Sequence, residues 1–249
     1  MERIEGEIFY NGRDILKMTD TELHSLRGSQ ISMIFQDPMA CLNPRKKVGE
    51  SIAQGLDIHH LYSSRAERQE KVAAILKKVG LAPEHADRYP HQFSGGQRQR
   101  VGIARALIMD PKLIIADECI SALDVSIQAQ VVNLMKDLQE ETGTAYLFIA
   151  HDLSMVKYIS DRIGVLHLGH LVETGTTEEI FSNPVHPYTQ SLLSAIPQPD
   201  PRTERGRVAK SYDYRTAGVD YLAGKQQHLG GTHYVLATDE ELARWTARA

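Results

Sequence analysis

The sequence is poor in the features that mark several specialised classes of protein. Only two cysteines, Cys41 and Cys119, occur in 249 residues, and they lie far apart. Without a Cys-x-x-Cys pair we expect neither a disulfide scaffold nor a structural zinc site, and we expect a reducing compartment. The longest fully apolar run is residues 145–150, whereas a membrane-spanning helix needs about 20 residues. Any association with a membrane is therefore expected to go through a partner.

An excess of charge of one sign is also missing. The chain has 28 Lys and Arg against 32 Asp and Glu, a net charge of −4. A general nucleic-acid binder is usually basic, so we expect no nucleic acid among the partners. With 42% hydrophobic and 24% charged residues, the composition excludes collagen-like, low-complexity and disordered chains. A chain of this length can bury roughly 70–75% of its unfolded surface, so its core needs no disulfides. We expect one large domain, or one domain with a small appendage.

Short apolar runs alternate with amphipathic segments along the chain. The apolar runs predict strands at residues 4–10, 30–35, 113–116, 146–150, 163–168, 170–174 and 233–237. Helices are expected to start after cap residues near positions 19, 64, 94, 176 and 238, and to include residues 127–138. Buried strands that alternate with helices predict an α/β fold with a largely parallel sheet.

Polar residues follow three of these strands directly. Gln36 comes after the first, Asp117 and Glu118 after the second, and His151 after the third. Ligands of parallel sheets bind at the carboxyl ends of the strands. There an acid pair is suited to hold Mg²⁺ with one carboxylate and to polarise a water for attack on a phosphoryl group with the other. Taken alone, the pair is equally consistent with two exposed acids at a strand end.

A glycine turn precedes the helix expected after residue 94. The sequence Ser94-Gly95-Gly96 places free backbone amides at a positive helix end, which favours a phosphate. The alternative is a glycine turn that only caps the helix. We interpret Arg98 and Arg100, further along, as a solvated helix face, and we expect the histidines other than His151 at the surface.

Taken together, these motifs resemble those of the ATP-binding subunits of ABC transporters. Five motifs occur in the family's order across residues 1 to about 180. They are Gln36 in Phe-Gln-Asp-Pro, the signature Ser94–Gln97, the Walker B segment Leu113–Glu118, the loop Ser121–Asp124 that crosses to a partner subunit, and His151 in Ala-His-Asp-Leu. The resemblance implies an ABC-type P-loop NTPase nucleotide-binding domain at residues 1–182, with a helical subdomain at about 37–110.

The resemblance also implies the roles of individual residues in an ATPase that uses ATP and Mg²⁺. Glu118, His151 and Gln36 are expected to be catalytic, Glu118 as general base, and Asp117 with Gln36 to organise Mg²⁺. The residues expected to bind ATP across a dimer of two ATPase subunits are Ser94, Gly95, Gly96, Gln97 and Asp124.

A narrower resemblance concerns importers of peptides and nickel. Residues 37–50, with Leu42-Asn43-Pro44-Arg45, and the run from His186 to Leu193 resemble segments typical of these importers. We therefore expect residues 183–249 to form a small C-terminal appendage of the oligopeptide-importer type. The implied protein lies peripherally at the cytoplasmic face of the membrane and couples ATP hydrolysis to oligopeptide or dipeptide uptake. Its implied partners are a second ATPase subunit, identical or not, two transmembrane permease subunits and, indirectly, an extracytoplasmic peptide-binding protein.

The main departure from the family is a motif that these residues do not contain. Relatives carry Gly-x-x-x-x-Gly-Lys-Ser/Thr upstream of the segment that matches residues 5–8, and the single Gly-Lys pair here, Gly224-Lys225, has the wrong context. We therefore expect a truncated domain whose own nucleotide site lacks the loop that holds the β- and γ-phosphates. The alternative function is a catalytically incompetent partner that contributes only its signature to a full-length ATPase. A smaller departure is Cys119, a candidate for oxidation beside Glu118 or simply a tolerated substitution.

Overall fold

The computed structural model describes residues 6–196 and 210–247. Its contacts divide the chain into two compact units, Met1–His151 and Asp152–Ala249. The helices and strands of the first unit are β1 Phe9–Tyr10, β2 Arg13–Asp14, η1 Ile15–Lys17, α1 Asp20–Leu26, β3 Ile31–Ile34, α2 Val48–His59, α3 Arg65–Lys78, η2 Pro83–Asp87, η3 Pro90–Gln92, α4 Gly95–Leu107, β4 Leu113–Asp117, α5 Val125–Thr142 and β5 Ala145–Ile149. Those of the second are α6 Leu153–Ile159, β6 Arg162–His167, β7 His170–Thr176, α7 Thr177–Ser182, α8 Pro187–Ser194, β8 Lys225–Gly230, β9 His233–Ala237 and α10 Asp239–Thr246.

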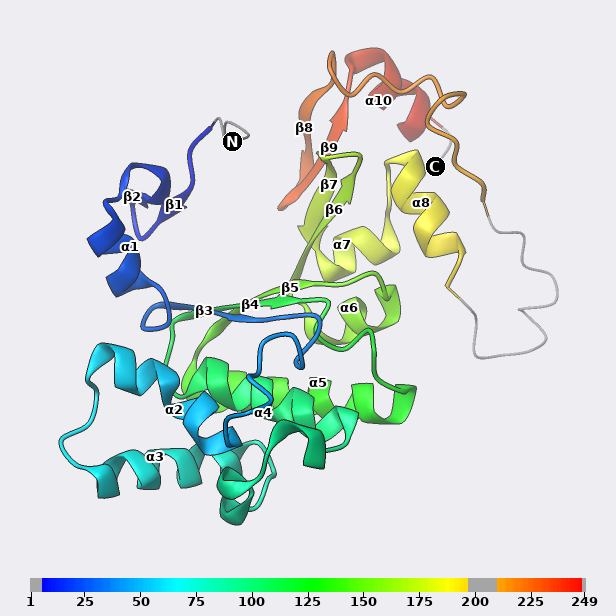
Figure 1. Ribbon diagram of the computed structural model, residues 1–249. Coiled ribbons are helices and arrows are strands. Elements are labelled where there is room, and N and C mark those ends of the chain that lie inside the picture. The colour runs from blue at the N-terminus through cyan, green and yellow to red at the C-terminus, as the bar shows by residue number, and fades with distance from the viewer. Residues whose placement is uncertain (1–5, 197–209, 248–249) are drawn as a thin grey trace. The chain divides into compact units, whose positions relative to one another are not determined.

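The centre of the first unit is the three-stranded sheet β3-β4-β5 (Figure 1). Both pairings are parallel, with Ile34 opposite Ala116 and Ala116 opposite Phe148, which confirms the parallel sheet expected from the sequence. Helices α4 and α5 cover one face, where Ile114 and Ala116 are fully buried (Figure 1). The opposite face carries the exposed side chains of Met33 and Leu147. None of the helices in the described residues combines the length and apolar character needed to cross a bilayer.

Helix α2 is not among the helices predicted from the sequence. Its apolar residues Val48, Ile52 and Leu56 recur every four positions and are almost fully buried, so the helical period was present in the sequence. The guanidinium of Arg68 on α3 donates to Asp57 on α2 through Nε at 2.6 Å and Nη2 at 2.7 Å. This bidentate pair ties the two helices together.

Most helix starts follow the cap residues that the sequence indicated. Thr19, Ser94, Thr176 and Thr238 form reciprocal capping boxes with the residue three positions on. At α3 the hydroxyl of Ser64 caps the helix alone. The carboxylate of Glu67, three positions on, accepts instead from the amide and hydroxyl of Ser63.

The interpretation of Arg98 and Arg100 as a solvated helix face was wrong. Both side chains are half-buried. Arg98 Nε donates to the Pro90 carbonyl at 3.2 Å, and Arg100 Nη1 donates to the Val79 carbonyl at 2.8 Å. The second contact satisfies a carbonyl at the C-terminus of α3, a favourable position for a cation.

The second unit is built on the antiparallel sheet β6-β7-β9-β8. The hairpin β6–β7 turns at Leu168 and Gly169, which both have positive φ, and β9 pairs with β7 through Glu173 opposite Val235. Residues 152–182 were expected in the first domain, but their strands β6 and β7 share one sheet with β8 and β9 of the C-terminal region, and the division by contacts falls after His151. Strand β8 was not predicted because its sequence, Lys-Gln-Gln-His-Leu-Gly, is largely polar.

A buried carboxylate organises the middle of the second unit. Glu173 on β7 is fully buried, and its oxygens accept from His233 Nε2 at 2.8 Å and from the amides of Val185 and His186 at 2.8 and 3.0 Å. The expectation of surface histidines was therefore wrong for His186 and His233, which are 0% and 4% exposed.

Candidate functional site

Three predicted site residues meet at the carboxyl edge of the parallel sheet. Gln36 follows β3 and donates from Nε2 to Glu118 Oε2 at 2.6 Å. His151 follows β5, and its Nδ1 lies 3.5 Å from Glu118 Oε1. The two side chains therefore flank one carboxylate that is itself about one third exposed. Because the three parallel strands are neighbours, residues 36, 118 and 151 come together although they are far apart in the sequence.

The backbone of Glu118 is held in an unusual conformation. Its φ is +42°, in the left-handed region that costs a non-glycine residue about 1–3 kcal/mol. The amide of Glu118 donates to the Ile149 carbonyl at 2.9 Å, and its carbonyl accepts from the amide and hydroxyl of Ser121 at 3.1 and 2.9 Å. The sequence indicated Ser121 only as the first residue of the loop 121–124, and no local pattern showed that it would hold Glu118.

The residues at this edge suit a hard divalent cation. Asp117 is the last residue of β4 and is half-buried. Gln36 uses its amide nitrogen on Glu118, which leaves its amide oxygen as a ligand atom. A carboxylate oxygen from Asp117 and an amide oxygen from Gln36 are of the kind that Mg²⁺ prefers.

The signature residues form a second group, at the N-terminus of α4. Ser94 Oγ accepts from the Gln97 amide at 3.4 Å, and Gln97 Oε1 accepts from the Ser94 amide at 3.1 Å. Both predicted side chains thus cap the helix. The amides of Gly95 and Gly96 remain in the first turn, where an α-helix has no internal acceptor for them. These amides and the helix dipole can bind an anion.

Asp124 lies at the N-cap of α5. Its Oδ1 accepts from Ser126 Oγ at 2.7 Å and from the Ile127 amide at 3.1 Å. The hydrogen bond from the Ser126 hydroxyl, and then that from the Ile127 amide, lower the pKa of the Asp124 carboxyl. The carboxylate is therefore ionised at neutral pH, with one oxygen committed to the cap.

The thiol of Cys119, the residue after Glu118, is buried. It is 2% exposed, and burial raises its pKa to about 12. Because the thiolate is the form that oxidises, the structure does not favour oxidation of this residue and agrees with the alternative of a tolerated substitution. Lys225, in the rejected Gly-Lys pair, pairs with Ala237 as the first residue of β8.

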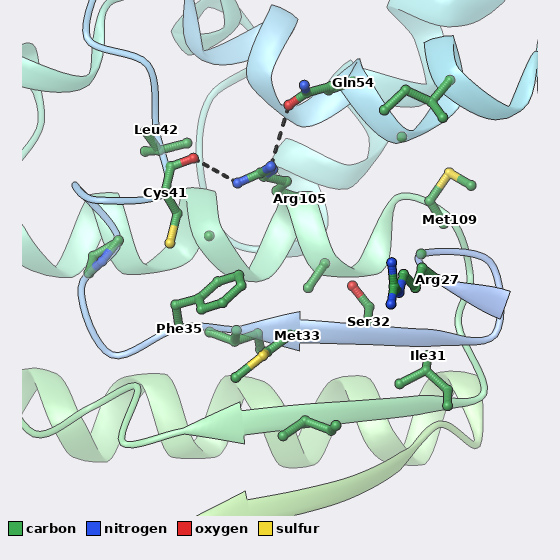
Figure 2. Close-up of a pocket in the computed structure, with 18 of the residues that line it drawn as sticks. Arg27, Ile31, Ser32, Met33, Phe35, Cys41, Leu42, Gln54, Arg105 and Met109 are labelled. Carbon is green, nitrogen blue, oxygen red and sulfur yellow. Dashed lines mark hydrogen bonds between the residues drawn. The ribbon is translucent and has the colours of Figure 1, made fainter. Parts of the chain in front are cut away.

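A separate groove of about 650 Å³ lies between β3, the loop after it, α2 and α4 (Figure 2). Most of its lining is apolar, with Phe35, Ile58 and Met109 among the residues. Arg105 crosses it and donates to the Cys41 carbonyl at 2.7 Å and to Gln54 Oε1 at 3.4 Å (Figure 2).

Within the described part of the chain, one buried side-chain nitrogen that lines this groove has no hydrogen-bond partner. Gln99 on α4 lines the groove and is 1% exposed, and its Nε2 makes no hydrogen bond among the described residues. Buried polar groups are nearly always hydrogen-bonded, so this amide is suited to donate to a group that enters the groove. The sequence placed Gln99 beside the signature but did not indicate that its side chain was buried.

Comparison with known families gives two matches along the chain. Residues 1–121 match the family described as "ABC transporter", and residues 172–218 match that described as "Oligopeptide/dipeptide transporter, C-terminal region". Among solved structures, a dimeric post-hydrolysis structure of the ATP-binding cassette MJ0796 bound to ADP and Pi is 31% identical, with a TM-score of 0.62 over 70% of this chain and 74% of that one. The cbiO1 protein of Clostridium perfringens is 28% identical, with a TM-score of 0.64 over 72% and 69%.

The similar curated proteins carry concordant names. The chain is 58% identical over 240 residues to the oligopeptide transport ATP-binding protein OppF of Streptococcus mutans, covering 95% of this chain and 76% of that protein. It is 60% identical to OppF of Bacillus subtilis, covering 96% and 79%, and 54% identical to the dipeptide transport ATP-binding protein DppF of Lactococcus lactis, covering 95% and 75%. The chain therefore belongs to the ATPase family of the oligopeptide and dipeptide ABC importers.

Proposed function

We propose that this chain is the subunit that binds and hydrolyses ATP in an importer of oligopeptides or dipeptides, peripheral to the cytoplasmic face of the membrane. The observation that carries the proposal is that Gln36 and His151 lie on either side of the Glu118 carboxylate, at the ends of three parallel strands. Parallel sheets bind their ligands at this edge.

Each residue of the group has a role that its position supports. Glu118 accepts the proton of the attacking water, as a carboxylate that is about one third exposed at a rigid strand end can do. His151 orients that water and the terminal phosphate, and Asp117 and Gln36 provide oxygen ligands for Mg²⁺. When bound, Mg²⁺ supplies charge neutralisation at the phosphates.

The second group of residues serves a site shared between two subunits. The amides of Gly95 and Gly96 at the start of α4 suit the terminal phosphate of a nucleotide held by the partner ATPase subunit. Ser94 and Gln97 fix this turn through the capping box, and Asp124 faces the partner from the start of α5. Two permease subunits and, indirectly, an extracytoplasmic peptide-binding protein complete the proposed importer.

Substitution of the proposed base tests the ATPase function. In the assembled transporter, Glu118→Gln is expected to lower ATP turnover by about 10²–10⁴-fold, the contribution typical of general-base catalysis, with little change in nucleotide affinity. Glu140→Gln removes the same charge from an exposed position on α5 and is the matched control. Equal turnover in both variants would contradict the assignment of Glu118.

Nucleotide binding separates the proposal from the alternative of an incompetent partner. The proposed function predicts sub-millimolar affinity for a fluorescent ATP analogue in a direct titration of the chain, whereas the alternative predicts no binding. The relatives do not favour the alternative, since each is itself described as an ATP-binding protein.

The groove between β3 and α2 is the proposed contact with a permease subunit. Its apolar lining fits an apolar segment, and Gln99 and Arg105 offer donors for the carbonyls or a carboxylate of that segment. Ile58→Asp places a charge in this lining and is expected to prevent co-purification with the permease subunits, because the groove would no longer favour apolar side chains. Leu61→Asp, at an exposed leucine outside the groove, should leave co-purification intact.

A further inference from the structure

The N-terminal turns of α4 and α5 lie against each other inside the first unit. A Cβ atom built on Gly96 would fall 2.5 Å from Ile127 Cγ2, a distance that real Cβ atoms do not adopt. A Cβ on Gly95 would instead meet Leu123 Cδ2 at 3.7 Å, an ordinary van der Waals contact. The two glycines are therefore not equivalent: an alanine fits at position 95 and clashes at position 96.

The same helix start is connected to Glu118 by one short hydrogen-bonded segment. Ser121 donates twice to the Glu118 carbonyl. The Ile120 carbonyl then accepts from the Leu123 amide at 3.1 Å and from Gln128 Nε2 at 3.0 Å. The segment thus runs from the proposed base into the first turn of α5, where Ile127 meets Gly96.

We propose that Ile127 is a positioning residue that sets the Gly95–Gly96 turn relative to the Glu118 carboxylate of the same chain. Residue 96 is glycine because the Ile127 side chain occupies the space of a Cβ. A displacement of the turn at the start of α4 is passed by Ile127 to the segment that holds Glu118. This inference rests on the proposed function for its catalytic consequence, while the contact itself is a property of the single chain.

The inference is tested by enlarging residue 96 and shortening residue 127, singly and together. Gly96→Ala is expected to displace α4 from α5, and Ile127→Ala in the same chain restores the space. In the purified chain, the ¹⁵N resonances of the His151 imidazole, which lies beside Glu118, should shift in Gly96→Ala and return in the double variant. In the assembled transporter, Gly96→Ala should lower kcat by about 100-fold, the effect expected of misplacing reacting groups by about 1 Å. The double variant should recover most of that loss.

Gly95→Ala is the matched control for the loss of a glycine in the same turn. Any change that it causes in turnover should not be relieved by Ile127→Ala, because its Cβ does not meet Ile127. Relief of both variants by Ile127→Ala would overturn the specific pairing. If His151 is unchanged in Gly96→Ala, or if its shift persists in the double variant, the inference is wrong.

Two measurements keep the outcomes separate. If Gly96→Ala does not fold, as shown by its thermal transition, Ile127→Ala alone must shift the His151 resonances for the inference to stand. If the wild-type transporter shows no ATP turnover, the proposed function fails, while the His151 spectra still decide whether Ile127 links the two turns.

Discussion

Both the side chain and the backbone of Glu118 are constrained by their neighbours. Its side chain is met from two neighbouring strands by Gln36 and His151, and its backbone is fixed in the left-handed region by Ile149 and Ser121. Strained backbone persists where surrounding contacts determine it, and such positions gather at functional sites. These contacts hold the carboxylate between Gln36 and His151.

The two cysteines are expected to differ sharply in reactivity. Burial raises the pKa of the Cys119 thiol to about 12, whereas Cys41 is only half-buried, although burial raises its pKa as well. With a thiol reagent at pH 8 under native conditions, Cys41 should be modified first and Cys119 only after unfolding. Mass spectrometry of labelled peptides measures both rates. Prompt labelling of Cys119 in the folded chain would contradict its burial.

At the scale of elements, the helix starts were predictable and the helix contacts were not. A serine or threonine with an acid or amide three residues later defines a cap by local geometry alone, as at Thr19 and Ser94. The partners of Arg98 and Arg100 are carbonyls in other elements. Their contacts depend on how α4 lies against η3 and the end of α3, which a local sequence pattern does not determine.

The contact of Arg100 with α3 has a measurable contribution to stability. Arg100→Met keeps much of the aliphatic packing and removes the donor to the Val79 carbonyl, so the free energy of unfolding should fall by about 1.5–3 kcal/mol, as for a hydrogen bond to a charged group. Urea denaturation gives the value. Arg65→Met, at an exposed position in the first turn of α3, should change the free energy of unfolding by no more than about 0.5 kcal/mol.

At the scale of the whole molecule, each unit has its own core. The first buries α4 and α5 against a parallel sheet. The second is centred on Ile163, Val172 and Ile180, with the buried Glu173 joining β7, β9 and the segment before α8. Because β9 completes the sheet with β7, residues near the C-terminus are part of this core.

The second unit is expected to lose stability in acid through His186. Burial, and then the nearby His167, lower the pKa of the His186 imidazole from 6.5 to about 4. The folded state therefore binds the proton less well than the unfolded state. This contribution to stability is full above pH 6.5 and is lost as the pH falls toward 4, a change of about 3 kcal/mol.

Denaturant unfolding at a series of pH values measures this loss. His186→Asn keeps an N-cap acceptor for α8 and removes the titrating ring. Its absolute stability should be lower, because a cavity replaces the imidazole, but its stability should fall less than that of the unsubstituted protein between pH 6.5 and 4.5. The fall that remains comes from other groups, among them His167, whose pKa burial also lowers. The same pH dependence in both proteins would show that another group is responsible.

What the sequence determined by itself is whatever depends on near neighbours. Strand and helix periods, the caps and the order of the five motifs indicated the parallel sheet and the residues at its edge, because side chains two positions apart in a strand, or three to four apart in a helix, share a face. They also allowed residues 36, 118 and 151 to be predicted as one site, since parallel neighbouring strands end at a common edge.

What only the tertiary structure decided depends on residues distant in the chain. The polar strand β8 forms because β9 offers it an edge, the buried Gln99 faces a groove made by three other elements, and Gly96 meets Ile127 across two helices. None of these follows from a local pattern, because burial and close packing are properties of the space between elements. They arise when those elements are brought together.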